Sequence, residues 1–311
     1  MSKNLILVAG YPKTGSTWIR LMFEALTRSL DGRVAINELS DGFYGAWRRL
    51  LFDEVAPVNA ADLLPDEIDD LQPGVFRQVA TELSRPVLVK THSIAHRTRS
   101  GEWLYPPDCV RSVIYLVRHP FDVAVSFAHH LGLTVERTVE AMSLDLVMAA
   151  SETQLFFPLH ERIGSWTTNI NSWLDGAPYP ITLIRYEDLH KNPADSFGRA
   201  AAASGLERDR DSILRAAESI NFERLRSEEQ LYGFTERARS SPHFFRAGRP
   251  RSWEGKLDAS FREQIVRDHG ATMERLGYVA DGATEPLPPA SSQFGGISLP
   301  DNILASTGPP I

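Results

Sequence analysis

The sequence predicts an α/β protein of three layers, in which a central, mainly parallel sheet is flanked by helices. Two observations predict it: apolar runs of strand length alternate with helical patterns, and the chain of 311 residues is 42% hydrophobic, enough for a sizeable core. Short, mainly apolar runs without polar alternation are typical of parallel strands buried on both faces. They lie at residues 4–9, 86–91, 112–117 and 180–185. Ligands of such sheets bind beyond the carboxyl ends of the strands.

The first run, residues 4–9, ends at the stretch GYPKTGST, which begins with Gly10. Gly10 and Gly15 have the spacing of a nucleotide-binding P-loop, and a helical pattern begins near Ser16, so the fold is P-loop-like. Backbone N–H groups and the positive end of a helix would meet there, which predicts an anion site. Ser16 stands where a P-loop has its lysine, and Lys13 is the lysine nearby. A capped βα turn without a ligand remains the alternative.

The second run ends in Lys90 and is followed by Thr91 and His92. A histidine at a strand end can act as a general base, because its unperturbed pKa is close to neutrality. A histidine that only donates a structural hydrogen bond is the alternative. Lys90 beside it favours an anionic ligand.

The third run delivers Arg118 to the same edge, with Pro120 at a first helical position and Asp122 in the first turn. The planar guanidinium of Arg118 suits a phosphate, which Ser126 would also contact if the loop folds over it. An Arg118–Asp122 ion pair that only fixes the loop is the alternative.

Two further helices are predicted along the later part of the chain. In the first, apolar side chains recur on one helical face. They are Ile163, Trp166, Ile170, Trp173 and Leu174. The second is predicted from PADSFGRAAAASG, which runs from an early proline to a terminal glycine.

The composition changes at Asp281. Six of the 20 prolines lie between there and Ile311, and that segment contains no Lys or Arg. We therefore expect one domain at residues 1–280 and a Pro/Gly/Ser-rich tail or linker at 281–311.

The overall composition excludes several classes of protein. A formal charge of −7 and a pI near 5.7 argue against a general nucleic-acid binder. Cys109 is the only cysteine, so no disulfide within the chain and no cysteine-rich zinc site can form. No segment reaches the roughly 18 apolar residues of a membrane span, and no signal peptide is recognisable. We expect a cytoplasmic protein, and we assign no metal, since the adjacent His129 and His130 would point in different directions on a helix.

Three motifs taken together resemble a known family. YPKTGSTW, VKTH and RHPFDVAVS, in this order and at this spacing, resemble the sulfotransferases that use 3′-phosphoadenosine 5′-phosphosulfate (PAPS). Two further motifs extend the resemblance over roughly residues 4–258: IRYEDL, and FFRAGRPRSW, which is similar to the Arg-Lys-Gly loop and tryptophan of the family.

The resemblance implies a role for each matching position. Those that match the 5′-phosphosulfate loop are Lys13, Thr14, Gly15, Ser16 and Thr17; those that match adenine contacts are Trp18, Tyr186 and Phe222; those that match the 3′-phosphate site are Arg118, Ser126, Arg246 and Gly248. The chain departs from the pattern at Ala247, where many members have lysine. Arg249 or Arg251 is a candidate to replace that phosphate contact.

The reaction that the resemblance implies is direct, in-line transfer of a sulfuryl group from PAPS to a hydroxyl of a small molecule, with 3′-phosphoadenosine 5′-phosphate (PAP) as the product. His92 would accept the hydroxyl proton, Lys13 would stabilise the leaving phosphate, and Lys90 would add a second positive charge. In a loose displacement most of the charge develops on the bridging oxygen, so a lysine aimed there can suffice without metal.

Two other functions compete with this one. A P-loop nucleotide kinase would need a lysine just before Ser16 or Thr17, which the sequence lacks. A non-catalytic module that binds an adenine nucleotide would not need Lys90 and His92 at a strand end. Carbohydrate sulfation outside the cytoplasm fits poorly with the single cysteine and the lack of a signal peptide.

The acceptor is expected to lie against residues 31–85, 127–160 and about 230–250, which interrupt the core motifs. Their aromatic side chains predict an apolar pocket for a phenol, an alcohol or a lipid-like or polyketide-like molecule, or else they belong to the core. They are Phe43, Tyr44, Trp47, Phe52, Phe156, Phe157, Tyr232 and Phe234. The sequence does not predict an oligomeric state.

Overall fold

A parallel sheet forms the centre of the protein, as the apolar runs predict. The computed structural model describes residues 3–28, 34–39, 44–45, 48–148, 159–206, 208–238 and 240–279. Its sheet has the strand order β2-β3-β1-β4-β7, with every pair parallel. The strands are β1 (Leu5–Ala9), β2 (Tyr44–Gly45), β3 (Val87–Thr91), β4 (Val110–Val117) and β7 (Ile181–Arg185). All four predicted strands are confirmed.

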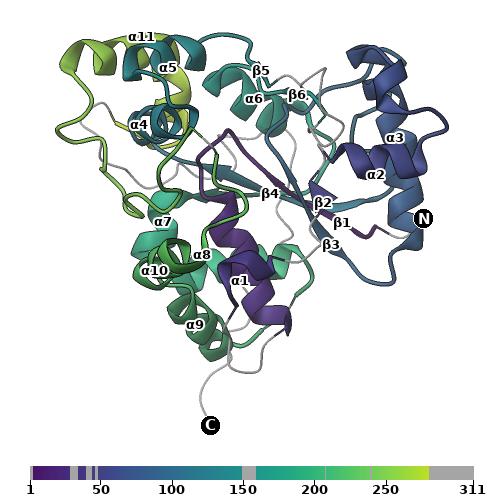
Figure 1. The fold of residues 1–311 in the computed structure, drawn as a ribbon, viewed down its shortest axis with the longest axis horizontal. Coiled ribbons are helices and arrows are strands. Elements are labelled where there is room, and N and C mark those ends of the chain that lie inside the picture. Colours follow the sequence, from purple (N-terminus) through teal and green to yellow (C-terminus); the bar gives the residue numbers. More distant parts are fainter. Residues whose placement is uncertain are drawn as a thin grey trace.

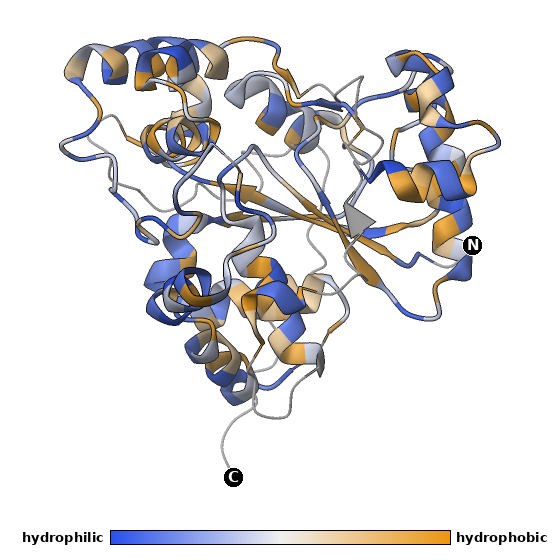
Figure 2. Cartoon of the chain, in the orientation of Figure 1, coloured by the Kyte–Doolittle hydropathy of each residue, from blue (hydrophilic) through white to orange (hydrophobic). Residues whose placement is uncertain are grey.

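Helices cover both faces of this sheet (Figure 1). On one face lie α1 (Ser16–Arg28), α8 (Pro193–Ala203), α9 (Arg210–Ser219) and α10 (Phe222–Tyr232); on the other lie α3 (Pro65–Glu82), α4 (Pro120–Leu131), α6 (Trp166–Gly176) and α11 (Ala259–Arg275). Alternate strand residues divide between the two layers: Ile6 and Val8 pack with α1 and α8, and Leu7 packs with α4 and α6. The strands are accordingly hydrophobic on both faces, whereas the helices are mixed (Figure 2).

The remaining elements lie at the edges of these layers. They are η1 (Ile36–Glu38), α2 (Arg49–Val55), η2 (Ala60–Asp62), α5 (Val135–Met142), β5 (Val147–Met148), β6 (Glu161–Arg162) and α7 (Tyr186–Lys191). A third apolar cluster joins α2 to α3, and β5 pairs antiparallel with β6. Among the described helices, none is long and apolar enough to cross a membrane.

Local sequence signals account for the ends of the predicted helices. Pro120 and Pro193 occupy the first turns of α4 and α8, where proline has no hydrogen bond to lose. Ser165 caps α6 by accepting the N–H of Thr168. Both predicted later helices are therefore confirmed as α6 and α8, but Ile163 precedes α6, because the helix begins only after its cap at Ser165.

The register of the sheet brings separate motifs to one edge. Ala9 of β1 is paired with Thr91 of β3, and Val117 of β4 is paired with Arg185 of β7. The residues that follow these strands come from distant parts of the chain, yet they lie side by side. The predicted tail at 281–311 and the side chains of Phe43, Tyr44, Trp47, Phe156 and Phe157 lie outside the described residues.

Candidate active site

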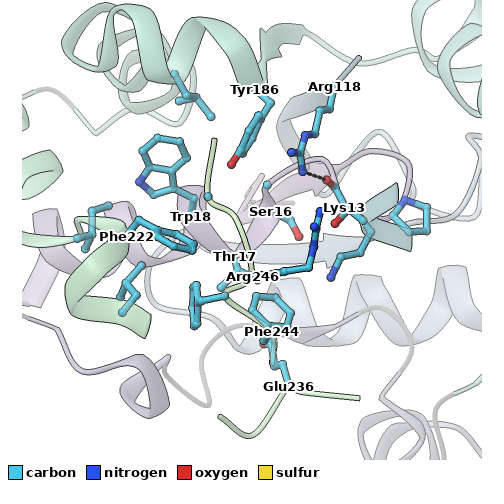
Figure 3. A pocket seen from close by; sticks show the side chains of 18 of the residues that line it. Lys13, Ser16, Thr17, Trp18, Arg118, Tyr186, Phe222, Glu236, Phe244 and Arg246 are labelled. Carbon is cyan, nitrogen blue, oxygen red and sulfur yellow. Dashed lines mark hydrogen bonds between the residues drawn. The ribbon is translucent and has the colours of Figure 1, made fainter. Parts of the chain in front are cut away.

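A cavity of about 810 Å³ lies at this edge of the sheet (Figure 3). Every predicted site residue lines it except Thr14. The lining residues among them are Lys13, Gly15, Ser16, Thr17, Trp18, Lys90, His92, Arg118, Ser126, Tyr186, Phe222, Arg246 and Gly248. The hydroxyl of Thr14 is buried and donates to the carbonyl of Tyr11 at 2.8 Å, so it stabilises the loop instead of facing the cavity.

The loop after β1 needs both of its glycines. A Cβ at Gly10 would lie 2.4 Å from the carbonyl oxygen of Leu116, and one at Gly15 would lie 2.9 Å from the ring of Tyr186. Both residues have positive φ angles, of 152° and 104°. The glycines therefore allow the loop to pass close to β4 and to α7 on its way into α1.

Lys13 is held in the left-handed region with φ 72°. Its carbonyl accepts a hydrogen bond from Arg118 at 3.3 Å, and its Nζ lies 4.4 Å from the centroid of the Phe244 ring. Burial, and then the charges of Lys90 and Arg118, lower the pKa of Lys13 to about 7. Because these cations repel one another in a partly buried site, an anion bound among them would be strongly favoured.

His92 presents one ring nitrogen to the cavity. Its Nδ1 lies 2.7 Å from the carbonyl oxygen of Gly10, which can only accept, so Nδ1 donates and Nε2 is left unprotonated. Burial and the charge of Lys90 lower the pKa of His92 to about 3, which keeps the ring neutral. The backbone is also held, since the His92 N–H donates to Glu161 at 2.9 Å.

Glu236 is a charged neighbour that sequence reasoning missed. Its carboxylate lies 3.6 Å from Nζ of Lys90 and 2.5 Å from Nη1 of Arg20. Burial disfavours the charge, but Lys90 and Arg20 lower the pKa of Glu236 to about 2. It follows α10 in a segment without periodicity, so no sequence pattern distinguishes it from a surface residue.

Arg118 and Arg246 form a second cationic centre. The guanidinium of Arg118 lies 4.1 Å from the Tyr186 ring centroid, and its Nε has no hydrogen-bonding partner among the described residues. Burial, and then Arg118, lower the pKa of Arg246. The Arg118–Asp122 ion pair also exists, at 3.7 Å. Asp122 therefore holds Arg118 and also the late loop, residues 246–253, because it accepts the N–H of Arg251 at 2.8 Å.

The rings of Trp18, Tyr186 and Phe222 form an aromatic slot beside this centre. Trp18 packs edge-on against Tyr186, with ring centroids 5.9 Å apart. Phe222 lies under the late loop, and a Cβ at Gly248 would come within 1.9 Å of its ring, so only glycine allows this contact. Figure 3 shows the rings of Trp18 and Phe222 on one side of the pocket and Lys13 and Arg118 on the other.

Another part of the cavity lining is mostly apolar, and the three proposed acceptor aromatics whose side chains are described do not belong to it. Phe52 and Phe234 are buried in the hydrophobic clusters, and Tyr232 is 76% exposed, so none of the three lines the cavity. The residues of this part of the lining are Phe127, His130, Met148, Leu159, Glu161 and Phe244. Only contact across the sheet edge identifies them, since they come from four separate segments.

Neither arginine suggested as a replacement for the missing lysine lines the cavity. Arg249 contributes its carbonyl, which accepts from Arg118 at 3.3 Å. Arg251 turns outward and pairs with Glu254 at 2.6 Å, with half of its side chain exposed. The second cationic centre therefore consists of Arg118 and Arg246.

The donor groups fit a nucleotide that carries phosphate at two places. One cationic centre surrounds Lys13 and Lys90, another surrounds Arg118 and Arg246, and the aromatic slot lies beside them. The unpartnered Nε atom of Arg118 and the Nε1 atom of Trp18 remain to be satisfied. An adenine nucleotide with a second phosphate would supply acceptors for both cationic centres and a ring for the slot.

Comparisons with known proteins point to one family. The sequence pattern of the sulfotransferase domain family matches residues 3–277. Sulfotransferase 1 family member D1 of Rattus norvegicus is 24% identical over 285 residues, which cover 86% of this chain and 83% of the relative. Flavonol 3-sulfotransferase of Flaveria bidentis is 24% identical over 276 residues, covering 84% and 79%.

The fold is shared with a solved structure as well. Retinol dehydratase, solved in complex with androsterone and the inactive cofactor PAP, superposes with a TM-score of 0.57 at 20% sequence identity. The superposition covers 88% of this chain and 82% of the other.

Proposed function

The chain belongs to the sulfotransferase family, and we propose that it transfers a sulfuryl group from PAPS to a hydroxyl of a small-molecule acceptor. The observation that carries the proposal is the position of the unprotonated Nε2 of His92 in the same cavity as Lys13, Lys90 and Arg118. That arrangement places a proton acceptor beside a strongly cationic anion site.

The nucleotide would bind through both cationic centres. Lys13 and the loop to Thr17 would hold the 5′ end, Arg118, Ser126 and Arg246 would hold the 3′-phosphate, and the adenine would lie against Trp18, Tyr186 and Phe222. Support comes from the solved retinol dehydratase complex, which contains PAP. Bound PAPS supplies the sulfuryl group and a nucleotide leaving group.

His92 would act as the general base. Its Nδ1–H is committed to Gly10, so Nε2 can accept the proton of an acceptor hydroxyl as the hydroxyl attacks. Lys13 would stabilise the charge that develops on the leaving oxygen, and Lys90 would add charge near the transferred group. With these lysines in place, we propose that transfer proceeds without a metal ion and without a covalent intermediate.

The two competing functions are less well supported. A nucleotide kinase would need the lysine that Ser16 replaces. A non-catalytic binding module would not need a neutral histidine tied by its Nδ1 at the edge of the anion site. We further propose an acceptor that is in part apolar, because Phe127, Leu159 and Phe244 also line the cavity. We propose a cytoplasmic location as well.

A calorimetric titration with PAP tests this function. We expect metal-independent binding that Arg118→Ala weakens about ten- to a hundredfold, since charge-assisted hydrogen bonds to the phosphate are lost. Arg267→Ala is the matched control, because that side chain is 70% exposed on α11 and should leave binding unchanged. ATP with Mg²⁺ is the competitor, and a preference for it over PAP would contradict sulfuryl transfer.

A further inference from the structure

A buried carboxylate, Glu161, lies at the acceptor end of the cavity. It belongs to β6, is 8% exposed, and lines the cavity together with His92. It has no part in the donor site or in the proton transfer described above. An acidic side chain in a mostly apolar wall is costly unless a partner satisfies it.

Among the residues that the structure describes, those that bond to the Glu161 carboxylate reach only its Oε1 atom. Oε1 accepts the N–H of His92 at 2.9 Å and the hydroxyl of Thr91 at 3.1 Å. The Ser93 N–H donates to the hydroxyl of Thr91 at 3.0 Å and also lies close enough to the carboxylate to oppose the rise in its pKa. Among the described residues, Oε2 makes no hydrogen bond, so it can accept one from a ligand.

The surrounding structure holds Glu161 in this position. Its two neighbours in sequence both lie at ion-pair distance from Asp69 of α3: Nε2 of His160 lies 3.0 Å from Oδ1, and Nε of Arg162 lies 3.0 Å from Oδ2. Asp69 is itself 3% exposed. The backbone on both sides of Glu161 is therefore anchored, and the carboxylate stays in the cavity.

The charge of the site favours a neutral donor over a cationic group as the ligand's partner for Oε2. Burial raises the pKa of Glu161, while the His92 N–H and the charge of Lys90 oppose that shift. Lys90 and Lys13 already line the same cavity, so a cationic group on the ligand would meet repulsion as well as attraction. A neutral donor such as a hydroxyl meets no such repulsion.

We propose that Glu161 selects the acceptor by accepting a hydrogen bond from a second hydroxyl, near the hydroxyl that is sulfated. The acceptor is then a diol or a polyphenol whose remaining surface is apolar enough to lie against Phe127, Leu159 and Phe244. This inference rests on the proposed function. It makes Glu161 a specificity residue in addition to a support for the His92 backbone.

Glu161→Gln separates these two roles. The amide oxygen of glutamine can still accept from the His92 N–H and the Thr91 hydroxyl, but its NH₂ then faces the cavity and cannot accept from a ligand. Glu161→Leu removes both functions. Glu140→Leu is the control, because Glu140 is an exposed residue of α5.

The test compares sulfation of phenol with that of catechol, resorcinol and hydroquinone, using PAPS and each variant. We expect the ratio of kcat/KM for the best dihydroxybenzene to that for phenol to fall about ten- to a hundredfold in Glu161→Gln. Intrinsic reactivity cancels in this comparison, because each acceptor is compared with itself between variants. A ratio unchanged by Glu161→Gln would overturn the proposal, even if kcat/KM fell by the same factor for all acceptors.

Two further arms complete the design. The aminomethylphenols test the charge argument, and a preference for them that Glu161→Gln abolishes would overturn the choice of a hydroxyl. PAP affinity is also measured for the wild-type protein. If PAP does not bind, the proposed function is contradicted, and not only the role of Glu161. If PAP binds but no acceptor is sulfated, binding of the same panel to the PAP complex is measured by calorimetry. The proposal is overturned if the complex binds the dihydroxybenzenes no more tightly than phenol.

Discussion

Nδ1 of His92 donates a hydrogen bond to the carbonyl oxygen of Gly10 at 2.7 Å, and this contact determines which nitrogen can act as a base. The carbonyl belongs to the loop that leads to Lys13, so one hydrogen bond couples the end of β3 to the anion site. Gly10 cannot be replaced without a clash with β4, because its Cβ would lie 2.4 Å from the carbonyl oxygen of Leu116. The orientation of the base thus depends on the backbone of the P-loop-like turn.

Replacing the base should affect turnover and spare nucleotide binding. For His92→Ala we expect kcat to fall by about 10² to 10⁴, the usual contribution of a general base, while PAP affinity changes less than about threefold. His243→Ala is the control, since that histidine is exposed. The measurement is steady-state sulfation beside calorimetry with PAP. Wild-type turnover in His92→Ala would exclude His92 as the base.

PAP binding should take up protons near neutral pH. The pKa of Lys13 is about 7 in the free protein and should rise when an anion binds, so the ligand favours the protonated form. Affinity should therefore fall as the pH rises through 7. Calorimetry near pH 7 in buffers of different ionisation enthalpy should show an uptake of about half a proton, reduced in Lys13→Met. Proton release, or no pH dependence, would contradict this.

The contact between Gly248 and Phe222 should be essential for nucleotide binding. In Gly248→Ala the new methyl group would overlap the Phe222 ring, and the residue would keep a φ of 59°, so PAP affinity should fall about tenfold or more. Gly233→Ala is a matched control, with φ 72° but open space around its Cβ. It isolates the cost of the backbone conformation from that of the overlap.

A double substitution tests whether the overlap is the cause. In a protein with Phe222→Ala, adding Gly248→Ala should cost much less affinity than it does alone, because the clashing ring is gone. Additive losses in the cycle would mean that Gly248 acts independently of Phe222. The readout is again the dissociation constant of PAP.

Glu236→Gln should change stability and anion affinity in opposite directions. The ion pair with Arg20 is lost, which should lower the free energy of unfolding by about 2 kcal/mol, whereas PAP should bind more tightly because a negative charge leaves the anion site. Glu263→Gln, an exposed position of α11, is the control. Denaturant unfolding and PAP calorimetry give both values. A loss of stability together with a loss of affinity would indicate a purely structural role.

Much of the fold and of the donor site can be predicted from the sequence because local patterns specify them. The run at 113–117 has no charged residue and no break in its hydrophobic character, which is typical of a strand covered on both faces. The glycines of the first loop and Pro120 mark turns and helix starts through their own backbone preferences. Since parallel strands end at one edge, their last residues necessarily converge there, as Lys90 and Arg118 do.

Tertiary structure alone decided the other features, because they depend on contacts between residues far apart in sequence. Glu161 and Glu236 lie where no periodicity marks them, and they face the cavity only because β6 and the segment after α10 return to the sheet edge. Thr14 shows that even within a recognised motif the sequence does not determine where a side chain points, since its hydroxyl donates to the Tyr11 carbonyl and does not face the cavity. A sequence pattern specifies which backbone conformations are favourable, whereas which side chains share a buried space follows from packing that the whole chain determines together.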